Sequence, residues 1–573
     1  MGTAPPAAGL SLRNLFHHKW LVGAFWFFLT GALFFSAVRD LPLIRSEAMY
    51  ALVPKEMGEA GTWLTPTLNG ARYLDKPPLL YWVNLLAYKL GGVSETTARI
   101  PTLMAAAGEV GLTYLVGIEV LGPRPAFWGS LVLLTSVGFF ALHLQLLTDH
   151  LVTLSLLVAL YVMLLTEGRL ASGRPAGSQP VFFQMALAAG FLSKGLIGFV
   201  FPLMILAGYS GLRRNAGLLS LVLNPRGWLV FLLLSLPWLG AMEYHHPGFL
   251  RHHILNEQIL RFLGERQPPD INSFSLGGFW LFLFLWLLPW GLLLPEALYC
   301  YVREAWRSSL AFGREGLMPL WAAVVLLFFS LSSSRIEYYS LPALPPLALI
   351  LGWRLSRIIA TPGDRRLPLV LFLLGFLGLA TLLLLPHLEE LCAANRREFF
   401  GMFPLIQPWA RQVTYIVPGL SLTGVVLGWR RPRVALAFYG TLALVLLFFT
   451  WKTYLALSPL LSDKIFGEYL RKAAAPGDVV VMEAIEEFEY GASLAFYSGR
   501  RILMVQRRGL PQFAYAVSPR ENFLISATRL EELWRSPSRV YLLVDEAILS
   551  EVRLPEGILV QALPGKRLLS NRP

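Results

Sequence analysis

The chain has 573 residues, of which 55% are hydrophobic and only 15% are charged, and its net charge is +13. This balance excludes an ordinary set of soluble domains and predicts a protein that lies mainly in a lipid bilayer. The basic residues form small clusters between apolar runs instead of one basic surface, which argues against a nucleic-acid-binding protein.

Apolar runs that could cross a hydrocarbon core of about 30 Å follow one another along most of the chain. The first run follows two basic residues, as a signal sequence does, but its length and the many later runs favour a retained span. We predict about thirteen transmembrane helices. The runs are residues 20–38, 100–119, 126–146, 150–166, 181–193, 195–211, 228–243, 277–300, 318–333, 338–357, 367–386, 412–428 and 434–451.

The basic clusters indicate how these runs are threaded. Alternate crossing places nearly all the clusters on one side, which the positive-inside rule identifies as the cytoplasm, together with the N-terminus. Cys300 and Cys392 then lie on opposite sides, so we expect no disulfide between them. The opposite, periplasmic side receives residues 39–98, 244–275, 387–411 and everything after Trp451.

The composition changes after residue 451. Short β-branched runs, DVVVMEA, RILMVQ and RVYLLVDEA, alternate with helix-like stretches at 485–497 and 527–535. This pattern predicts that residues 452–573 form a soluble α/β domain, while residues 1–451 form the membrane domain. No glycine-rich phosphate-binding motif occurs in the soluble part.

The first periplasmic loop holds the densest group of ionisable residues. The segment SEAMYALVPKEM has the spacing of an interfacial helix, and Glu47 at its start could act as a general base. Further on, YLDKPPLLYW places Asp75 and Lys76 before two prolines, which fix the direction of the chain. We expect Lys76 to contact an anionic head group, the alternative being a lysine that snorkels to the interface.

Two later turns add further candidates. Asp149 and His150 lie between two apolar runs, and Asp149 is either functional or a helix cap. Lys194, at the outer end of the short run at 181–193, is a second cation for the same pocket or a snorkelling lysine.

The loop that contains FLRHHILNEQILRFL has His253 and Glu257 at positions i and i+4, which could share a metal ion or simply lie on an interfacial helix. The segment SSSRIEYYS places Arg335, Tyr338 and Tyr339 at the mouth of a span, where tyrosines are also common as interface anchors. No metal is required by these patterns, and a divalent ion stays an alternative.

In this order the segments SEAMYALVPKEM, YLDKPPLLYW, TDHLVT, FLSKGLIGFVFP, FLRHHILNEQILRFL and SSSRIEYYSLPALPPLA resemble the bacterial membrane glycosyltransferases of the aminoarabinose-transferase and protein-O-mannosyltransferase type, the GT-C class. The resemblance covers most of residues 20–360 and is weak over the C-terminal part. It implies a periplasmic active site, a polyprenyl-phosphate (undecaprenyl phosphate) sugar donor and inversion at the anomeric carbon. The implied acceptor is lipid A or a related lipid at the bacterial inner membrane.

The resemblance also implies roles for individual residues. Family members carry Asp-Glu where this chain has Ser46-Glu47, so either Glu47 takes the role of the missing Asp or the acceptor needs no base. Asp149 matches the acidic residue of the family's second loop, and the expected catalytic residues are Glu47 and Asp149. Lys76 matches the lysine that contacts the donor phosphate, and we group it with the other cations and tyrosines. The expected donor-phosphate residues are Lys76, Lys194, Arg335, Tyr338 and Tyr339, and the expected substrate-positioning residues are Tyr50, Arg72, Asp75 and His150.

Three alternatives remain at this level. A protein could accept the sugar in place of lipid A. A transporter or flippase would need charged residues in mid-span and repeats with broken helices, whereas here the charges cluster in the outer loops. A non-catalytic scaffold is the third alternative, because the usual acid is replaced by Ser46.

Overall fold

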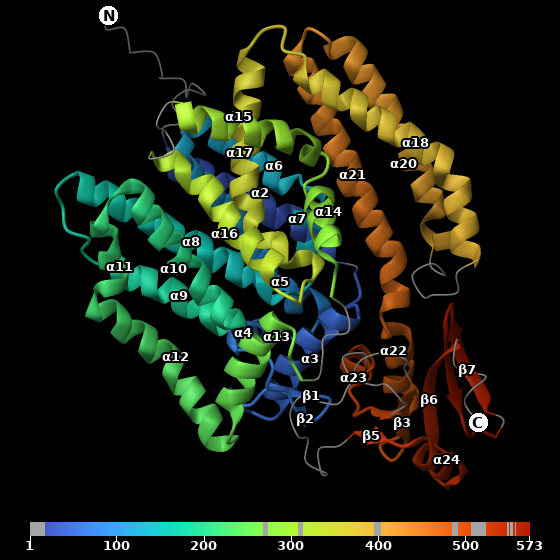
Figure 1. Ribbon diagram of the computed structural model, residues 1–573. Helices are drawn as coiled ribbons and strands as arrows, with labels where there is room; N and C mark the ends of the chain where they lie inside the picture. The colour runs from blue at the N-terminus through green and yellow to red at the C-terminus, as the bar shows by residue number, and fades with distance from the viewer. Residues whose placement is uncertain are drawn as a thin grey trace, which may run out of the picture.

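The structure is a computed structural model (Figure 1). It consists of a bundle of long helices and a small α/β domain that lies at the lower end of α21 in this view. It describes residues 18–39, 41–267, 273–307, 313–394, 403–483, 491–505, 523–546, 549, 554–555 and 557–573.

Nine helices within the described residues are long and apolar enough to cross a membrane, and two bent pairs raise the number to eleven. All the predicted apolar runs lie in helices, so the multi-span architecture is confirmed, although a count of thirteen is not. One reason is that α9 (Gln179–Lys194) has only 16 residues. The nine are α2 (Lys19–Val38), α5 (Glu95–Leu121), α8 (Thr148–Ala171), α10 (Leu196–Arg213), α12 (Pro225–His245), α16 (Leu317–Leu331) with the turn η5 (Arg314–Gly316), α17 (Leu344–Ala360) with η6 (Glu337–Ala343), α18 (Arg366–Ala394) and α21 (Pro432–Leu461).

Two predicted spans are bent. Helices α6 (Pro123–Leu134) and α7 (Val137–His143) meet at 56°. At this break the hydroxyls of Thr135 and Ser136 donate to carbonyls one turn earlier, a bond that favours helix bending. Helix α14 (Leu276–Trp286) meets the segment formed by η3 (Trp290–Leu293) and α15 (Leu294–Arg307) at 107°, next to Pro289, which has no N–H to continue the helix.

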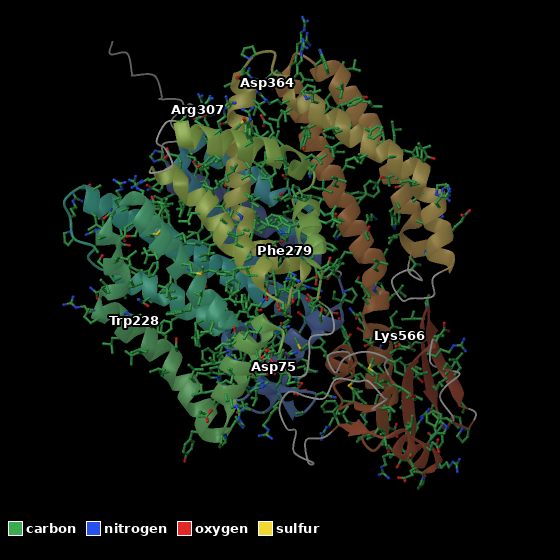
Figure 2. The ribbon with its side chains drawn as sticks, in the orientation of Figure 1. Asp75, Trp228, Phe279, Arg307, Asp364 and Lys566 are labelled. Carbon is green, nitrogen blue, oxygen red and sulfur yellow. The ribbon has the colours of Figure 1, made fainter. Side chains whose placement is uncertain are left out.

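Short elements gather at one end of the bundle. They come from the predicted loops 39–98 and 244–275. Figure 2 places Asp75 at this end and Arg307 at the opposite end, as the predicted threading requires. The elements are α3 (Arg45–Glu59), β1 (Thr67–Leu68), β2 (Ala71–Arg72), α4 (Leu79–Gly91), the π-helix η2 (Arg251–Leu260) and α13 (Arg261–Leu263), while η1 (Ala216–Leu219) and α11 (Ser220–Leu223) connect α10 to α12.

The described parts of the third predicted loop, residues 387–394 and 403–411, are helical. Helix α18 extends to Ala394, and α20 (Phe403–Gly428) begins before the predicted apolar run at 412–428. Both helices therefore continue beyond the apolar parts that the sequence indicated. The side chain of Cys392 lies outside the described residues, and Cys300 is a free thiol.

The C-terminal part is an α/β domain, as predicted. It begins only after α21 ends at Leu461, because this helix continues past Trp451. Its sheet has the strand order β5-β4-β3-β6-β8-β7, with parallel pairing from β5 to β6 and antiparallel pairing for β8 and β7. The strands are β3 (Val479–Glu483), β4 (Leu503–Val505), β5 (Leu524–Ile525), β6 (Val540–Asp545), β7 (Ile558–Leu563) and β8 (Lys566–Ser570), and the helices are α22 (Lys464–Ala473), α23 (Gly491–Ser498) and α24 (Ala527–Arg535).

The three predicted strands are thus β3, β4 and β6, and the predicted helix at 527–535 is α24. Of the helix predicted at 485–497, the part before Gly491 lies outside the described residues.

The α/β domain packs directly on the first loop. The side-chain amide of Asn69 donates to the carbonyl of Ile502 at 2.8 Å and its oxygen accepts from the N–H of the same residue at 2.9 Å. The Tyr497 hydroxyl accepts the N–H of Leu43 at 2.7 Å. The domain and the first loop therefore lie at the same end of the bundle, as the threading predicted.

Candidate active site

A buried ion pair joins the first turn of α8 to the last residue of α9. The Lys194 ammonium lies 2.6 and 2.7 Å from the two carboxylate oxygens of Asp149. It also lies 4.3 Å from the centroid of the Tyr339 ring and 5.4 Å from that of Tyr338. Four predicted site residues from three distant segments therefore meet at one place.

A second group of charges lies beside this pair. The Lys76 ammonium is 3.8 Å from a carboxylate oxygen of Glu257, which also pairs with Arg261 at 3.6 Å. Burial lowers the pKa of Lys76, and the charge of Arg261 lowers this pKa further. Lys76 and Arg261 thus share one carboxylate, while Lys194 pairs with Asp149, and cations of this kind can stabilise an anion.

Arg261 and Arg266 were not among the predicted site residues. Arg266 donates to Glu257 at 2.7 Å and lies 3.5 Å from Asp75. A signal for Arg261 was present, because it follows Glu257 by four positions in the segment FLRHHILNEQILRFL. Arg266 lies beyond this segment, and no sequence pattern linked it to Asp75.

Asp75 is held in its ionised form. Burial alone would raise its pKa, but the hydrogen bond from His252 at 2.9 Å and the neighbouring cations lower the pKa of Asp75 to about 2. Asp75 therefore anchors the loop that carries Lys76 to the π-helix η2. The substrate-positioning role that was predicted for Asp75 stays a prediction.

The positions of His253 and Glu257 do not support the alternative that these two residues share a metal ion. Residues 251–260 form a π-helix, in which residues five apart lie on one face, so His252 and not His253 lies beside Glu257. The His253 ring instead stacks on Phe249, with centroids 5.1 Å apart. Asp75, His252 and Glu257 have ligand atoms within 4.8 Å of one another. Arg266 and Lys76 already neutralise these carboxylates, so the group fits a divalent metal poorly.

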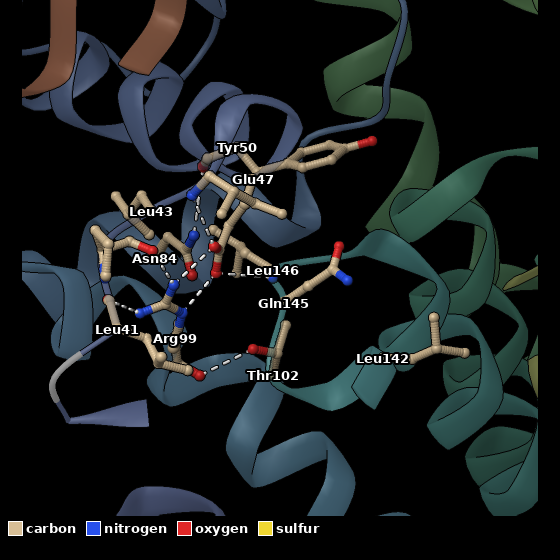
Figure 3. A network of polar contacts seen from close by, with 12 residues as sticks. Leu41, Leu43, Glu47, Tyr50, Asn84, Arg99, Thr102, Leu142, Gln145 and Leu146 are labelled. Atoms are coloured by element: carbon tan, nitrogen blue, oxygen red, sulfur yellow. Dashed lines mark hydrogen bonds and ion pairs between the residues drawn. The ribbon is translucent and has the colours of Figure 1, made fainter. Parts of the chain in front are cut away.

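Glu47 does not have the surroundings of a general base. Its carboxylate is fully buried and accepts two hydrogen bonds from Arg99, at 2.5 and 2.7 Å (Figure 3). It also accepts the N–H groups of Leu146 and Ile44, at 3.2 and 3.3 Å. Arg99 in turn donates to the carbonyl of Leu41 at 2.6 Å. The pair holds the start of α3 against α5, which contradicts the prediction that Glu47 takes the proton.

The other residues of α3 are placed differently. Ser46 is exposed, and Tyr50 stacks on Tyr81 with ring centroids 6.5 Å apart. The phenol of Tyr50 points away from the Glu47–Arg99 pair in Figure 3. Tyr50 and Asp149 both act electrostatically on Tyr338. The predicted substrate-positioning role of Tyr50 stays a prediction.

His150 belongs to a separate buried group. Its Nε2 atom lies 3.1 Å from the carbonyl of Leu142, and its ring stacks on His143 at 3.8 Å. The Nε2 atom of His143 lies 3.2 Å from an oxygen of Glu109. These three residues, one each from α5, α7 and α8, have ligand atoms within 4.8 Å of one another and could also hold a metal ion. We find no contact that gives His150 its predicted positioning role.

Two further predicted residues lie outside the group. Arg335 donates to the backbone carbonyls of Phe274 at 3.1 Å and Ser332, so it stabilises the turn before η6 and is not oriented toward an anion. Arg72 lies 3.5 Å from a ring nitrogen of His246, at the end of α12. The predicted phosphate role of Arg335 is therefore contradicted, whereas Arg72 stays a prediction.

The fold defines the class. The structure superposes on the crystal structure of ArnT from Cupriavidus metallidurans bound to undecaprenyl phosphate, with a TM-score of 0.79 and 20% identity over 96% of this chain and 98% of that one. The apo form of that protein gives a TM-score of 0.78. The chain is a multi-span membrane protein with the GT-C fold, as the sequence resemblance predicted.

Within this class, the chain is similar to aminoarabinose transferases. It is 30% identical over 345 residues to the undecaprenyl phosphate-alpha-4-amino-4-deoxy-L-arabinose arabinosyl transferase of Edwardsiella ictaluri, covering 59% of this chain and 60% of that protein. It is 31% identical over 383 residues to the protein of the same name from Pseudomonas aeruginosa, covering 64% and 66%. The alignments therefore span less than two thirds of these relatives. Residues 75–240 match the family described as dolichyl-phosphate-mannose-protein mannosyltransferase.

Proposed function

We propose that the chain is a glycosyltransferase that moves a sugar from a polyprenyl-phosphate donor to lipid A or a related lipid. The observation that carries the proposal is the buried pair of Lys194 and Asp149 beside Tyr339, together with the cations Lys76 and Arg261 that pair with Glu257. The fold of a protein crystallised with undecaprenyl phosphate and the names of the relatives support the same donor.

The reaction needs few groups. The bond between the anomeric carbon and a phosphate oxygen breaks, and the acceptor oxygen bonds to that carbon. The leaving phosphate is already a stable anion, so cations that neutralise its growing charge are sufficient and no general acid is required. Lys194, Lys76 and Arg261 supply three such cations.

Asp149 is the best-placed base. A donor phosphate at Lys194 competes with Asp149 for the ammonium group and thereby frees a carboxylate oxygen, which then accepts the proton of the acceptor hydroxyl. A phosphate acceptor that is already ionised makes this step unnecessary. Glu47 takes no part in the chemistry, because Arg99 neutralises it.

The proposed reaction is not routed through a metal, because Arg266 and Lys76 already balance the carboxylates of Asp75 and Glu257. The proposed orientation follows the basic clusters, with the N-terminus in the cytoplasm and the active site and α/β domain in the periplasm. The inner membrane is the proposed location.

A protein acceptor is the second candidate function. The observation that favours it is the match of residues 75–240 to a family named for protein mannosyl transfer. The donor chemistry would be unchanged, since only the group that attacks the anomeric carbon differs.

Mass spectrometry of lipid A tests the proposal. Cells that lack the protein are complemented with the wild type, with Lys194→Gln or with the control Lys89→Gln, at an exposed lysine in the last turn of α4. Lipid transfer is supported if lipid A carries a fixed sugar mass in cells with the wild type or Lys89→Gln. This mass should be absent in cells with Lys194→Gln. Unchanged lipid A together with a sugar mass on periplasmic proteins would move the acceptor to protein. No difference in either pool would overturn the proposed reaction.

A further inference from the structure

The carboxylate of Glu109 has unusual surroundings for a buried acid. It lies in the middle of α5, a helix long enough to cross the membrane, and its side chain is fully buried. Glu47 and Asp149 each pair with an arginine or a lysine, but within the described residues no such side chain pairs with Glu109. An acid at this depth is costly without a partner, so its partner is a neighbouring neutral group or a bound ion.

The side chain that contacts Glu109 is His143 of α7. Its Nδ1 atom lies 2.7 Å from the carbonyl of Phe139. A carbonyl oxygen only accepts hydrogen bonds, so Nδ1 carries a proton and the neutral ring has its lone pair on Nε2. This Nε2 atom lies 3.2 Å from a carboxylate oxygen of Glu109. Two acceptors that face each other at this distance need a proton or a metal ion between them.

His150 of α8 is held in a similar way. Its Nε2 atom lies 3.1 and 3.2 Å from the carbonyls of Leu142 and Gln145, so this atom donates and Nδ1 has the lone pair. The Nδ1 atom of His150 and the second oxygen of Glu109 are buried and have no hydrogen-bond partner in the described part of the chain. Backbone carbonyls thus fix both rings in tautomers that leave one nitrogen unprotonated, as they do for histidines that bind metals.

The three side chains lie close enough together to share one ion. One ligand atom from each of them lies within 4.8 Å of the other two. Ligand atoms around a tetrahedral zinc ion are about 3.3 Å apart. The ligand atoms of Glu109 and His143 already have this separation, at 3.2 Å, so His150 is the residue that has to move closer. Two histidines and one glutamate are a common zinc ligand set and leave a fourth position for water.

We propose that Glu109, His143 and His150 bind one zinc ion. The ion supplies the positive charge that the Glu109 carboxylate needs and a partner for the two unprotonated ring nitrogens. It also joins α5, α7 and α8. Because His150 directly follows Asp149, the ion fixes the first turn of α8, which carries the Asp149–Lys194 pair. The inference does not depend on the proposed glycosyl transfer, and the ion takes no part in that reaction.

Metal analysis of the full-length protein in detergent, with its affinity tag removed, tests the inference. The protein is stripped with a chelator and dialysed against zinc, and bound metal is measured by elemental mass spectrometry. We expect one zinc ion per chain. Glu109→Gln and His150→Gln should each lower the zinc affinity at least about 100-fold. His252→Gln is the matched control, because His252 belongs to the second group of ligand-type residues, and it should keep the wild-type affinity.

Two further measurements report on the site itself. Cobalt that replaces zinc should give the visible absorption of a four-coordinate ion in the wild type and in His252→Gln, and not in Glu109→Gln. Zinc should raise the midpoint of thermal unfolding of the stripped wild type and leave that of Glu109→Gln unchanged. Should Glu109→Gln fail to fold, His150→Gln replaces it, and the zinc titration of the stripped wild type needs no variant.

The competing occupant is a proton shared by Glu109 and His143. In that case the stripped wild type binds no more zinc than Glu109→Gln does. Infrared spectroscopy then shows the C=O stretch of a protonated carboxylic acid, which disappears in Glu109→Gln. This result would overturn the inference. Zinc binding that is lost in His252→Gln and kept in Glu109→Gln would assign the ion to the other group and would also overturn it.

Discussion

Lys194 contacts both carboxylate oxygens of Asp149, at 2.6 and 2.7 Å, while its ammonium lies over the ring of Tyr339. One cation is thus shared between a carboxylate and an aromatic face in a nearly buried position. An incoming phosphate must therefore compete with Asp149 for Lys194.

This competition leads to opposite effects of two substitutions. Lys194→Gln should weaken donor binding and lower transfer about 100-fold, because a preorganised charge is lost. Asp149→Asn should leave donor binding unchanged or tighter, because Lys194 is released, while kcat falls. Donor affinity and kcat measured separately on purified protein test this pair. Weaker donor binding by Asp149→Asn would contradict the competition, and Lys89→Gln is the control.

The Glu47–Arg99 pair should act on stability and not on chemistry. Glu47→Gln leaves a buried guanidinium without its counter-charge, so it should destabilise the protein by about 3–5 kcal/mol. The double variant Glu47→Gln, Arg99→Gln should recover part of this loss. Thermal unfolding in detergent measures the effect. Glu47→Gln with wild-type stability and no transfer would restore the role of general base that the geometry argues against.

His253 should make the stability depend on pH. Burial, assisted by the charge of Lys76, lowers the pKa of His253 to about 4. The unfolded chain therefore binds a proton below about pH 6.5 while the folded chain does not. The free energy of unfolding should fall by on the order of 3 kcal/mol as the pH drops from about 6.5 to about 4. Below about pH 4 the protonation of His253 should cause no further change in this free energy.

The variant His253→Phe should reduce this pH dependence, because phenylalanine can stack on Phe249 without titrating. Thermal unfolding of the wild type and the variant at pH 7.5 and pH 5 provides the comparison. Exposed His245 gives the control His245→Phe, which should keep the wild-type dependence. If the stability of His253→Phe depends on pH as strongly as that of the wild type, another group causes the dependence.

The α/β domain should stabilise the first loop. Tyr497→Phe removes the acceptor of the Leu43 N–H and leaves this buried group unpaired, at a cost of about 1–3 kcal/mol. Hydrogen exchange of residues 41–44 should rise in this variant. Tyr469→Phe, a half-buried tyrosine of α22, should leave the exchange unchanged. Equal exchange in the two variants would mean that the domain does not hold the loop.

The sequence predicted the multi-span architecture, and it identified several charged residues that the structure brings together. Apolar runs predict spans because a bilayer requires long uncharged helices, and strands β3, β4 and β6 were visible as β-branched runs. The charged residues of the outer loops were also identified, since such residues are rare in this composition. Lys194 and Asp149 were both found, although their direct contact was not.

The partners of charged residues were less predictable. Arg99 lies 52 positions after Glu47 at the start of an apolar run, so nothing in the local pattern connects the two. The π-helix at 251–260 changed which histidine lies beside Glu257, and the sequence spacing alone suggested an α-helix. Both errors arise because long-range packing decides the partner of a buried charge.

The central claim is that Lys194, Lys76 and Arg261 bind the donor phosphate during sugar transfer to lipid A. The most direct measurement is transfer by the purified, reconstituted protein from a polyprenyl-phosphate sugar to lipid A, followed by mass spectrometry of the products. We predict that the wild type and Lys89→Gln transfer the sugar, and that Lys76→Gln and Lys194→Gln lose at least about 100-fold in rate while remaining folded. Wild-type rates in both lysine variants would contradict the account.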